Sequence, residues 1–270
     1  MERVSAPIRI VGVFAHPDDD VFSVGGTFAL HASGVAPTLV FCTSGENGPI
    51  WVDGIATRDS LGAVREREQV AAMEGLGVRA RSVFLRYPDG GLTDVSREEL
   101  IGTISAVLRE VRPHVVVTFG ADGLTSHPDH VRAGEATSVA FERLRAEAGE
   151  AAPQRLLEVA LPASAVDRFD RQLPGGAGAG PAGSLLNLAS VPDARIWAGV
   201  DTRPVADRKR QAVEAHRTQI GELAMIPEEA RWLFFDTEWF VRAWPPRDTA
   251  EPAVADAFEG LDLHSDRGRE

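Results

Sequence analysis

Two short stretches of the sequence carry the residue types from which hydrolytic metal sites are built. The first reads AHPDDD, residues 15–20, and the second reads SHPDH, residues 126–130. Each follows an apolar run typical of a buried strand. A catalytic zinc ion is held by neutral imidazoles and carboxylates, with three protein ligands and one position left for water. His16, Asp19 and His130 would supply that set, so the two stretches predict a metal site.

The run of three carboxylates also has a structural explanation. Pro17 suits the first position of a helix, and Asp18, Asp19 and Asp20 would then occupy its first turn. Carboxylates there accept free backbone N–H groups and are favoured by the helix dipole. Taken alone, the run fits a helix cap as well as it fits a metal site. The second His-Pro-Asp triplet, again placed after a predicted strand, favours the metal site.

The elements that position these stretches alternate between strand and helix. Strands are expected at residues 8–15, 37–43, 81–87 and 114–120. Helices are expected at residues 21–34, 61–78 and 97–111. This order predicts a parallel sheet with right-handed crossovers and helices on both faces. The polar segments that follow the four strands would then meet at the carboxyl edge of the sheet, where ligands bind in such folds.

The second half of the sequence is less regular. Residues 155–162 and 194–200 are typical of strands, residues 205–220 of a helix, and residues 232–244 mix strand and loop signals. Residues 174–183 contain five glycines and two prolines, which indicates a flexible surface loop or a lid hinge. We expect one catalytic domain at residues 1–245 and a disordered polar tail at residues 246–270.

Composition and charge exclude several classes of protein. The chain has 270 residues, 44% of them hydrophobic, which suffices for one large α/β domain. Its net charge of -12 repels phosphate backbones and anionic membranes, so nucleic acid is not an expected partner. The single cysteine, Cys42, cannot form an internal disulfide. No membrane span or secretory signal is recognisable, and a cytoplasmic location is expected; a homo-oligomer remains open.

The motifs together resemble those of a known family. AHPDDD, YPDGGL at residues 87–92 and VVVTFGADGLTSHPDH at residues 115–130 are similar to motifs of the PIG-L/LmbE superfamily of zinc-dependent N-acetylglucosaminyl deacetylases. The resemblance covers residues 1–145, and AHRTQI at residues 215–220 resembles a further family segment. It implies a Rossmann-like (LmbE-like), mainly parallel sheet in three α/β/α layers without a nucleotide. The absence of GxGxxG after the first strand agrees with this.

The resemblance also implies roles for individual residues. It places the metal ligands on His16, Asp19 and His130, the general base on Asp18, and the partner of the developing oxyanion on His127. The implied cofactor is Zn²⁺, with other divalent metals open. Zinc lowers the pKa of its bound water to about 7, and a nearby carboxylate can take the proton as an amide carbonyl is attacked.

Two further residues are implied to contact the substrate, and two positions depart from the family pattern. Arg65 matches an arginine that contacts substrate, although a surface helix with ion pairs explains it too. Asp89 matches an aspartate that binds sugar hydroxyls, or it is an ordinary turn residue. Asp20 stands where the family has glutamate. Thr125 stands where some family members have tyrosine.

The sequence thus predicts a metal-dependent hydrolase that deacetylates a small-molecule N-acetylglucosamine conjugate. The same chemistry on a sugar-thiol conjugate, or on an N-acyl amino sugar of a natural product, is the nearest alternative. A non-catalytic sugar- or metal-binding protein would have no use for Asp18 beside the ligands. A metal-dependent phosphoesterase is disfavoured by the single ligand set and by the acidic charge.

Overall fold

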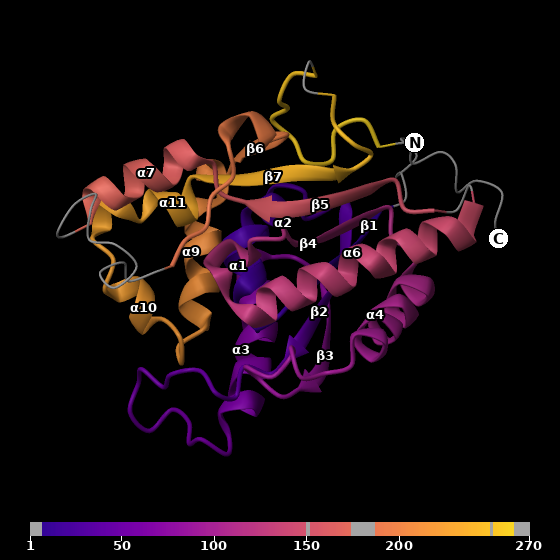
Figure 1. The fold of residues 1–270 in the computed structure, drawn as a ribbon. Coiled ribbons are helices and arrows are strands. Elements are labelled where there is room, and N and C mark those ends of the chain that lie inside the picture. The colour runs from indigo at the N-terminus through magenta and orange to yellow at the C-terminus, as the bar shows by residue number, and fades with distance from the viewer. Residues whose placement is uncertain (1–6, 150–151, 174–186, 249–250, 262–270) are drawn as a thin grey trace, which may run out of the picture.

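A seven-stranded sheet forms the centre of the molecule in its computed structural model (Figure 1). The structure describes residues 7–149, 152–173, 187–248 and 251–261. The strand order is β3-β2-β1-β4-β5-β7-β6. The strands are β1 (Ile8–Phe14), β2 (Val35–Thr43), β3 (Arg81–Tyr87), β4 (Val115–Phe119), β5 (Arg155–Ala160), β6 (Ala198–Asp201) and β7 (Thr237–Trp244).

The direction of the strands determines where a site can form. β1 to β5 run parallel to one another, whereas β7 runs antiparallel to both β5 and β6. β1 lies between β2 and β4, so the chain leaves β1 on one side and returns on the other. Such a reversal opens a crevice beyond the carboxyl ends of the strands. AHPDDD follows β1 and SHPDH follows β4, so both stretches lie at this crevice.

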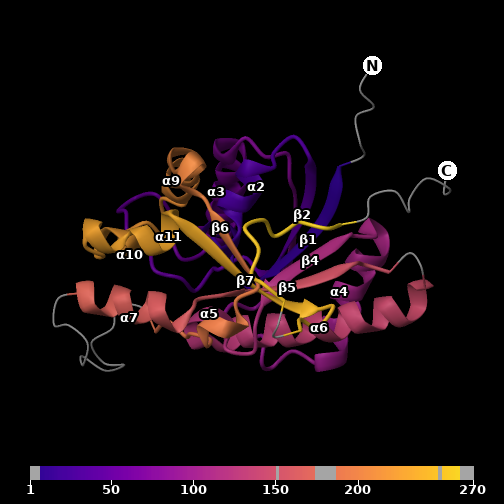
Figure 2. The ribbon, with the colours of Figure 1, turned by 90° about the horizontal axis from the view of Figure 1, so that it is seen from above.

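Helices cover both faces of the sheet. In Figure 2, α2, α3 and α9 lie on one side of the strands, and α4 and α6 lie on the other. The helices are α1 (Asp19–Ser23), α2 (Gly25–Leu30), α3 (Leu61–Leu76), α4 (Arg97–Val111), α5 (Gly123–Ser126), α6 (Pro128–Ala148), α7 (Ala163–Gln172), α9 (Ala206–Ala215), α10 (Gly221–Ala224) and α11 (Trp232–Phe235). Short 3₁₀ turns are Asp193–Arg195, Arg203–Val205 and Glu228–Ala230. The predicted three-layer α/β/α fold is confirmed.

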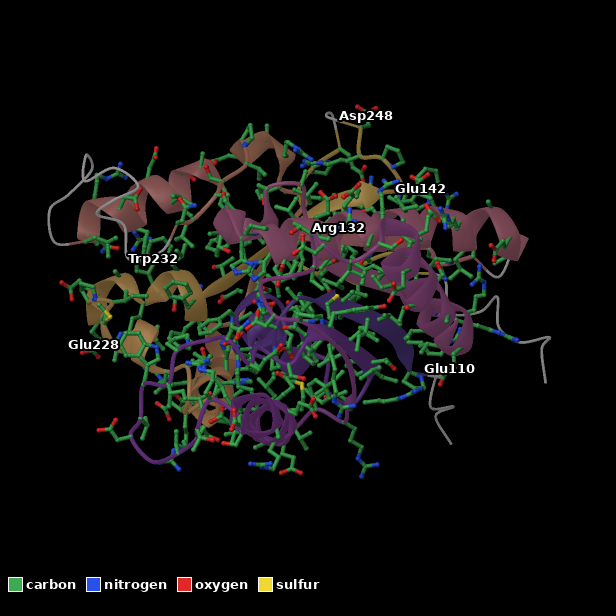
Figure 3. The ribbon with its side chains drawn as sticks, turned by 60° about the horizontal axis from the view of Figure 1, so that its bottom comes forward. Glu110, Arg132, Glu142, Glu228, Trp232 and Asp248 are labelled. Atoms are coloured by element: carbon green, nitrogen blue, oxygen red, sulfur yellow. The ribbon has the colours of Figure 1, made fainter. Side chains whose placement is uncertain are left out.

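The surface and the core are separated as the composition predicts. The buried core combines Val, Ile, Leu and Phe from the central strands with apolar side chains of the helices. Figure 3 shows Glu110, Glu142, Glu228 and Asp248 on the outside of the fold. Among the described residues, no helix is both long enough and apolar enough to span a membrane.

Several expected elements need correction. The strand expected at residues 194–200 begins only at Ala198, and the helix expected at residues 205–220 ends at Ala215. The helix expected at residues 21–34 is two short helices, because Val24 leaves the helical conformation between α1 and α2. The disordered tail expected from residue 246 is wrong for residues 251–261, where Ala257 and Phe258 are buried and the Arg155 guanidinium donates to the Ala257 and Glu259 carbonyls. These contacts attach the acidic segment to the rest of the fold. The glycine-rich segment 174–183 and residues 262–270 lie outside the described residues.

Candidate active site

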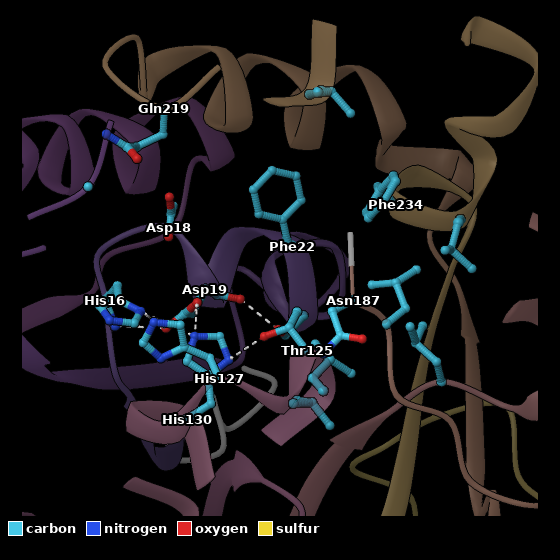
Figure 4. Close-up of a pocket in the computed structure, with 18 of the residues that line it drawn as sticks. His16, Asp18, Asp19, Phe22, Thr125, His127, His130, Asn187, Gln219 and Phe234 are labelled. Carbon is cyan, nitrogen blue, oxygen red and sulfur yellow. Dashed lines mark hydrogen bonds and ion pairs between the residues drawn. The ribbon is translucent and has the colours of Figure 1, made fainter. Parts of the chain in front are cut away.

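A cavity of about 480 Å³ opens at the carboxyl ends of β1 and β4 (Figure 4). All the residues that the sequence singled out as catalytic, metal-binding or substrate-binding line it. These are His16, Asp18, Asp19, Arg65, Asp89, His127 and His130. Most come from the segments that follow β1, β3 and β4, and α3 contributes Arg65.

Three of these side chains turn their donor atoms toward one another. His16 Nδ1 lies 3.2 Å from His130 Nε2. Asp19 places Oδ1 3.3 Å from His130 Nε2 and Oδ2 3.7 Å from His16 Nδ1. Zinc bound tetrahedrally at about 2.0–2.1 Å keeps neighbouring donors about 3.3–3.4 Å apart. The donor types therefore suit zinc, and the distances of 3.2 and 3.3 Å to His130 Nε2 are close to this spacing, whereas the His16–Asp19 distance of 3.7 Å is wider.

The other ring nitrogen of each histidine is held from behind. His16 Nε2 lies 3.0 Å from Asp89 Oδ1 and 3.5 Å from Asp129 Oδ2. His130 Nδ1 lies 2.9 Å from the Gly123 carbonyl oxygen. A proton on each of these outer nitrogens leaves the inner nitrogen with a lone pair for a metal. Metal-binding histidines in general are oriented by carboxylate and carbonyl partners in this way.

Other groupings of metal-binding types are also present among the described residues. The donor atoms of His16, His127 and His130 lie within 4.8 Å of one another, and so do those of His16, Asp89 and Asp129. In the second grouping both carboxylates face His16 Nε2, the nitrogen that points away from His130. That grouping therefore orients His16 and does not compete with Asp19 and His130.

The charges of the cluster are strongly coupled. Burial lowers the pKa of His16, but the carboxylates of Asp129, Asp89 and Asp19 outweigh it and raise that pKa to about 10. Burial alone would raise the pKa of Asp19, but the interactions with His130 and His16 outweigh burial, so the pKa of Asp19 is lowered. The carboxylates thus stabilise positive charge at the centre of the cluster, which a proton or a divalent cation can supply.

Asp18 lies beside this cluster in an unusual backbone conformation. Its φ of 115° is in the left-handed region, and α1 begins only at Asp19. The expectation that Asp18 occupies the first helical turn is therefore wrong. No side-chain cap bond forms from Asp18, and its Oδ2 accepts a hydrogen bond of 3.0 Å from the Arg65 guanidinium. Strained backbone of this kind is concentrated at functional sites.

Arg65 is itself fixed by backbone carbonyls. Its guanidinium donates to the carbonyl oxygens of Gly45 and Pro17 at 3.0 and 2.7 Å. The side chain is nearly buried, with an exposed fraction of 5%. A surface helix with ion pairs does not describe this position, because Arg65 points inward and anchors Asp18.

His127 caps α6 and faces the other two histidines. Its Nδ1 accepts the backbone N–H of Asp129 at 3.1 Å, so a neutral ring carries its proton on Nε2. The ring lies edge-on to His16 with centroids 4.9 Å apart. Burial, followed by His16 and His130, lowers the pKa of His127. The cap thus leaves a neutral imidazole whose Nε2–H is available as a donor.

Comparison with known proteins places the chain in a family. Residues 11–141 match the family model described as PIG-L, GlcNAc-PI de-N-acetylase. A 1D-myo-inositol 2-acetamido-2-deoxy-alpha-D-glucopyranoside deacetylase from Rhodococcus jostii is 35% identical over 243 residues, which cover 78% of this chain and 82% of the relative. The chain belongs to the PIG-L family. The predicted class, a hydrolase of non-peptide carbon–nitrogen bonds, agrees with this membership.

Solved structures extend the fold comparison beyond the family model. The N,N'-diacetylchitobiose deacetylase from Pyrococcus horikoshii has a TM-score of 0.56 at 22% identity, covering 87% of this chain and 83% of the other. The 4-carboxy-2-hydroxymuconate hydratase from Pseudomonas putida has a TM-score of 0.61 at 21% identity, covering 91% and 100%. At these identities the likeness shows the fold alone. Because a deacetylase and a hydratase share it, the reaction of this PIG-L chain must be argued from its site.

Asp20 and Thr125, the two departures from the family pattern, both have contacts in this PIG-L chain. Asp20 is fully buried, and its Oδ2 accepts a 2.9 Å hydrogen bond from Gln69 on α3. Burial raises the pKa of Asp20 to about 7, with smaller contributions from Asp19 and Asp18. Thr125 lines the cavity, and its Oγ1 lies 3.3 Å from His130 Nδ1.

Three polar residues with no predicted role take part in the site of this PIG-L protein. Asp129 accepts the N–H groups of Gly90 and Leu92 in addition to facing His16. Asn47 and Gln219 line the cavity. Asp129 lies within SHPDH and Gln219 within AHRTQI, so the motifs gave a signal for these two residues. Only the path of the backbone shows that their side chains turn inward.

Proposed function

We propose that this chain is a zinc-dependent hydrolase that removes an acyl group, acetyl in the first instance, from the 2-amino group of an N-acetylglucosamine conjugate. The observation that carries the proposal is the placement of Asp18. Its carboxylate lies at the cavity beside His16, Asp19 and His130 and is held there by a buried arginine. A protein that only stores metal or binds sugar has no need of such a carboxylate. The names of the relatives support the substrate class.

His16, Asp19 and His130 would hold the metal. Imidazole and carboxylate donors suit zinc, although other divalent ions accept the same set. When bound, the ion would polarise the amide carbonyl and make water more acidic. Asp18 would take the proton of the attacking water, and Arg65 would keep its carboxylate aimed at that position. The Nε2–H of His127 would donate to the carbonyl oxygen as that oxygen gains negative charge.

The contacts of Arg65 and Asp89 support roles different from the predicted substrate binding. The Arg65 guanidinium donates its hydrogen bonds to Asp18 and to backbone carbonyl oxygens. Asp89 Oδ1 contacts His16 Nε2, and Asp89 Oδ2 accepts the backbone N–H of Asn47. We therefore assign both as residues that position catalytic or metal-binding side chains. Asn47 and Gln219 also line the cavity, and although their amide nitrogens donate to the carbonyl oxygens of Asp89 and Pro49, their amide oxygens are the proposed contacts to sugar hydroxyls.

The decisive experiment replaces Asp18 by asparagine, which keeps the shape and removes the base. Positioned general bases contribute about 10²- to 10⁴-fold, so kcat for a zinc-loaded Asp18→Asn variant should fall by that factor. Release of free amine from an N-acetylglucosamine conjugate measures the rate, and mass spectrometry measures bound zinc. The matched control is Asp53→Asn, at an exposed aspartate away from the cluster. Full activity of Asp18→Asn at unchanged zinc content would remove Asp18 from the mechanism.

Removal of the metal tests the cofactor separately. Dialysis against a chelator should abolish amine release, and one equivalent of zinc should restore it. A stripped protein that hydrolyses the substrate at its original rate would show that the cluster needs no metal.

A further inference from the structure

The cavity continues beyond the catalytic residues into a region of different chemistry. We define the apolar arm by Phe22, Leu161, Leu188, Leu223, Leu233 and Phe234, all of which line the cavity. Figure 4 shows the three histidines at one end, Phe234 toward the other, and Phe22 between them. Leu223 and Leu233 are buried, while the remaining members are half-buried. The arm is therefore an apolar wall that an occupant can cover.

Most charged residues of the cavity lining come from the first half of the chain. Of the described lining residues that follow residue 130, Glu238 is the only one with a charged side chain. Its Oε1 accepts the Gly26 N–H and pairs with Lys209 at 2.6 Å, and its Oε2 accepts the N–H and the hydroxyl of Thr27. These contacts occupy both oxygens, so Glu238 is not available to bind a cation or a sugar hydroxyl in the arm.

The geometry points to an N-acyl chain longer than acetyl as the occupant of the arm, an inference that rests on the function proposed above. The reacting carbonyl carbon lies at the His16–Asp19–His130 cluster. From that atom a substrate extends in two directions, through nitrogen to the sugar and through the α-carbon to the acyl chain. The sugar needs hydrogen-bonding partners, which Asn47 and Gln219 offer at the polar end. Asn187, which lies toward the arm in Figure 4, offers one amide to a hydroxyl, but the six side chains of the arm offer none and would bury methylene groups instead.

The size of the cavity agrees with this division. At about 480 Å³ it falls within the range that encloses a whole drug-sized ligand. Each buried methylene contributes about 0.8 kcal/mol, which corresponds to about a fourfold gain in binding. A linear chain of four to eight carbons should thus be preferred over acetyl until the arm is filled. The hydrolysis itself is unchanged: the amide C–N bond breaks, and water supplies the hydroxyl of the released acid and a proton of the amine.

The test is an acyl-length series on one sugar. The methyl glycoside of glucosamine, N-acylated with acetyl, butanoyl or hexanoyl, gives the same amine product throughout, so one assay measures all three. We expect kcat/KM of the zinc-loaded enzyme to rise tenfold or more from acetyl to hexanoyl. A flat or falling series overturns the inference. A parallel series of N-acetylglucosamine methyl, butyl and hexyl glycosides covers the other direction, and a rise along that series alone would assign the arm to the aglycone and overturn it too.

A variant links the preference to the arm. Leu188→Asp places a carboxylate in the arm from a segment outside the strands and helices, so the fold should persist, as a thermal melt will check. The ratio of hexanoyl to acetyl kcat/KM should fall at least tenfold. The control, Leu30→Asp at an exposed leucine of α2, should leave that ratio unchanged. If no derivative is hydrolysed, acetyl included, the proposed function itself fails; if acetyl is hydrolysed without any gain from length, only the arm inference fails.

Discussion

His16 makes separate contacts with each of its two ring nitrogens. Its Nδ1 faces His130 and Asp19, while its Nε2 faces Asp89 and Asp129. The sequence places His16 and His130 in similar motifs, and their convergence could be predicted because both motifs follow parallel strands. The partners behind them could not be predicted. Asp129 turns inward because the N–H groups of Gly90 and Leu92 bind its carboxylate, and that depends on the exact path of a turn.

Replacement of Asp89 distinguishes orientation of His16 from recognition of sugar. Asp89→Asn keeps the size of the side chain but loses the charge behind His16, and loss of such partners typically costs 10- to 100-fold in metal affinity. We expect the zinc dissociation constant, measured by competition with a chromogenic chelator, to rise by that factor. KM at saturating zinc should change much less. The exposed Asp94→Asn serves as the control. A raised KM with unaltered zinc affinity would instead support the predicted role of Asp89 in binding sugar hydroxyls.

At the scale of elements, regularity decided what could be predicted. β1, β2 and β4 are largely buried and parallel, so each appears in the sequence as a continuous apolar run; β3 lies at the edge of the sheet and is only partly buried, but its run of Val, Phe and Leu gives the same signal. β6 has only four residues, and α10 and α11 have four each, too short for a periodic signal. The antiparallel placement of β7 beside β5 likewise leaves no local pattern. Half of the apolar arm, namely Leu223, Leu233 and Phe234, comes from α10 and α11, which is one reason why the sequence revealed the polar end of the cavity and not the other.

A buried ion pair joins β7 to α9. Lys209, the only lysine in the sequence, and Glu238 are both buried, and Glu238 also binds the backbone at the start of α2. Lys209→Met would leave the Glu238 carboxylate buried without its cation, which costs about 3–5 kcal/mol. We expect the free energy of unfolding in urea to fall by that amount. The exposed Arg79→Met should change it by no more than about 0.5 kcal/mol. An unchanged urea midpoint for Lys209→Met would show that the pair contributes no stability.

At the scale of the whole molecule, the two halves of the chain meet beside the site. Thr218, in the segment that resembles a family motif, donates both its N–H and its hydroxyl to Glu68 of α3. His216 is fully enclosed at the same junction, and neither ring nitrogen has a hydrogen-bond partner among the described residues. Burial, aided by the charge of Arg65, lowers the pKa of His216 to about 3. The junction therefore closes around a neutral histidine.

This buried histidine should make the fold sensitive to mild acid. In the unfolded chain the pKa of His216 is about 6.5. Between that pH and about 3, His216 is therefore protonated in the unfolded state but neutral in the folded state. The contribution of His216 to stability is complete above pH 7 and is lost as pH falls from about 6.5 toward 3, by up to about 1.4 kcal/mol per pH unit. Urea unfolding of metal-free wild type and His216→Leu at pH 7.5, 6.0, 5.0 and 4.5 measures this. The difference between the two proteins cancels the carboxylates and His16, which titrate in both. We expect the variant to lose stability less steeply with acid, whereas equal slopes would mean that His216 is protonated in the folded state.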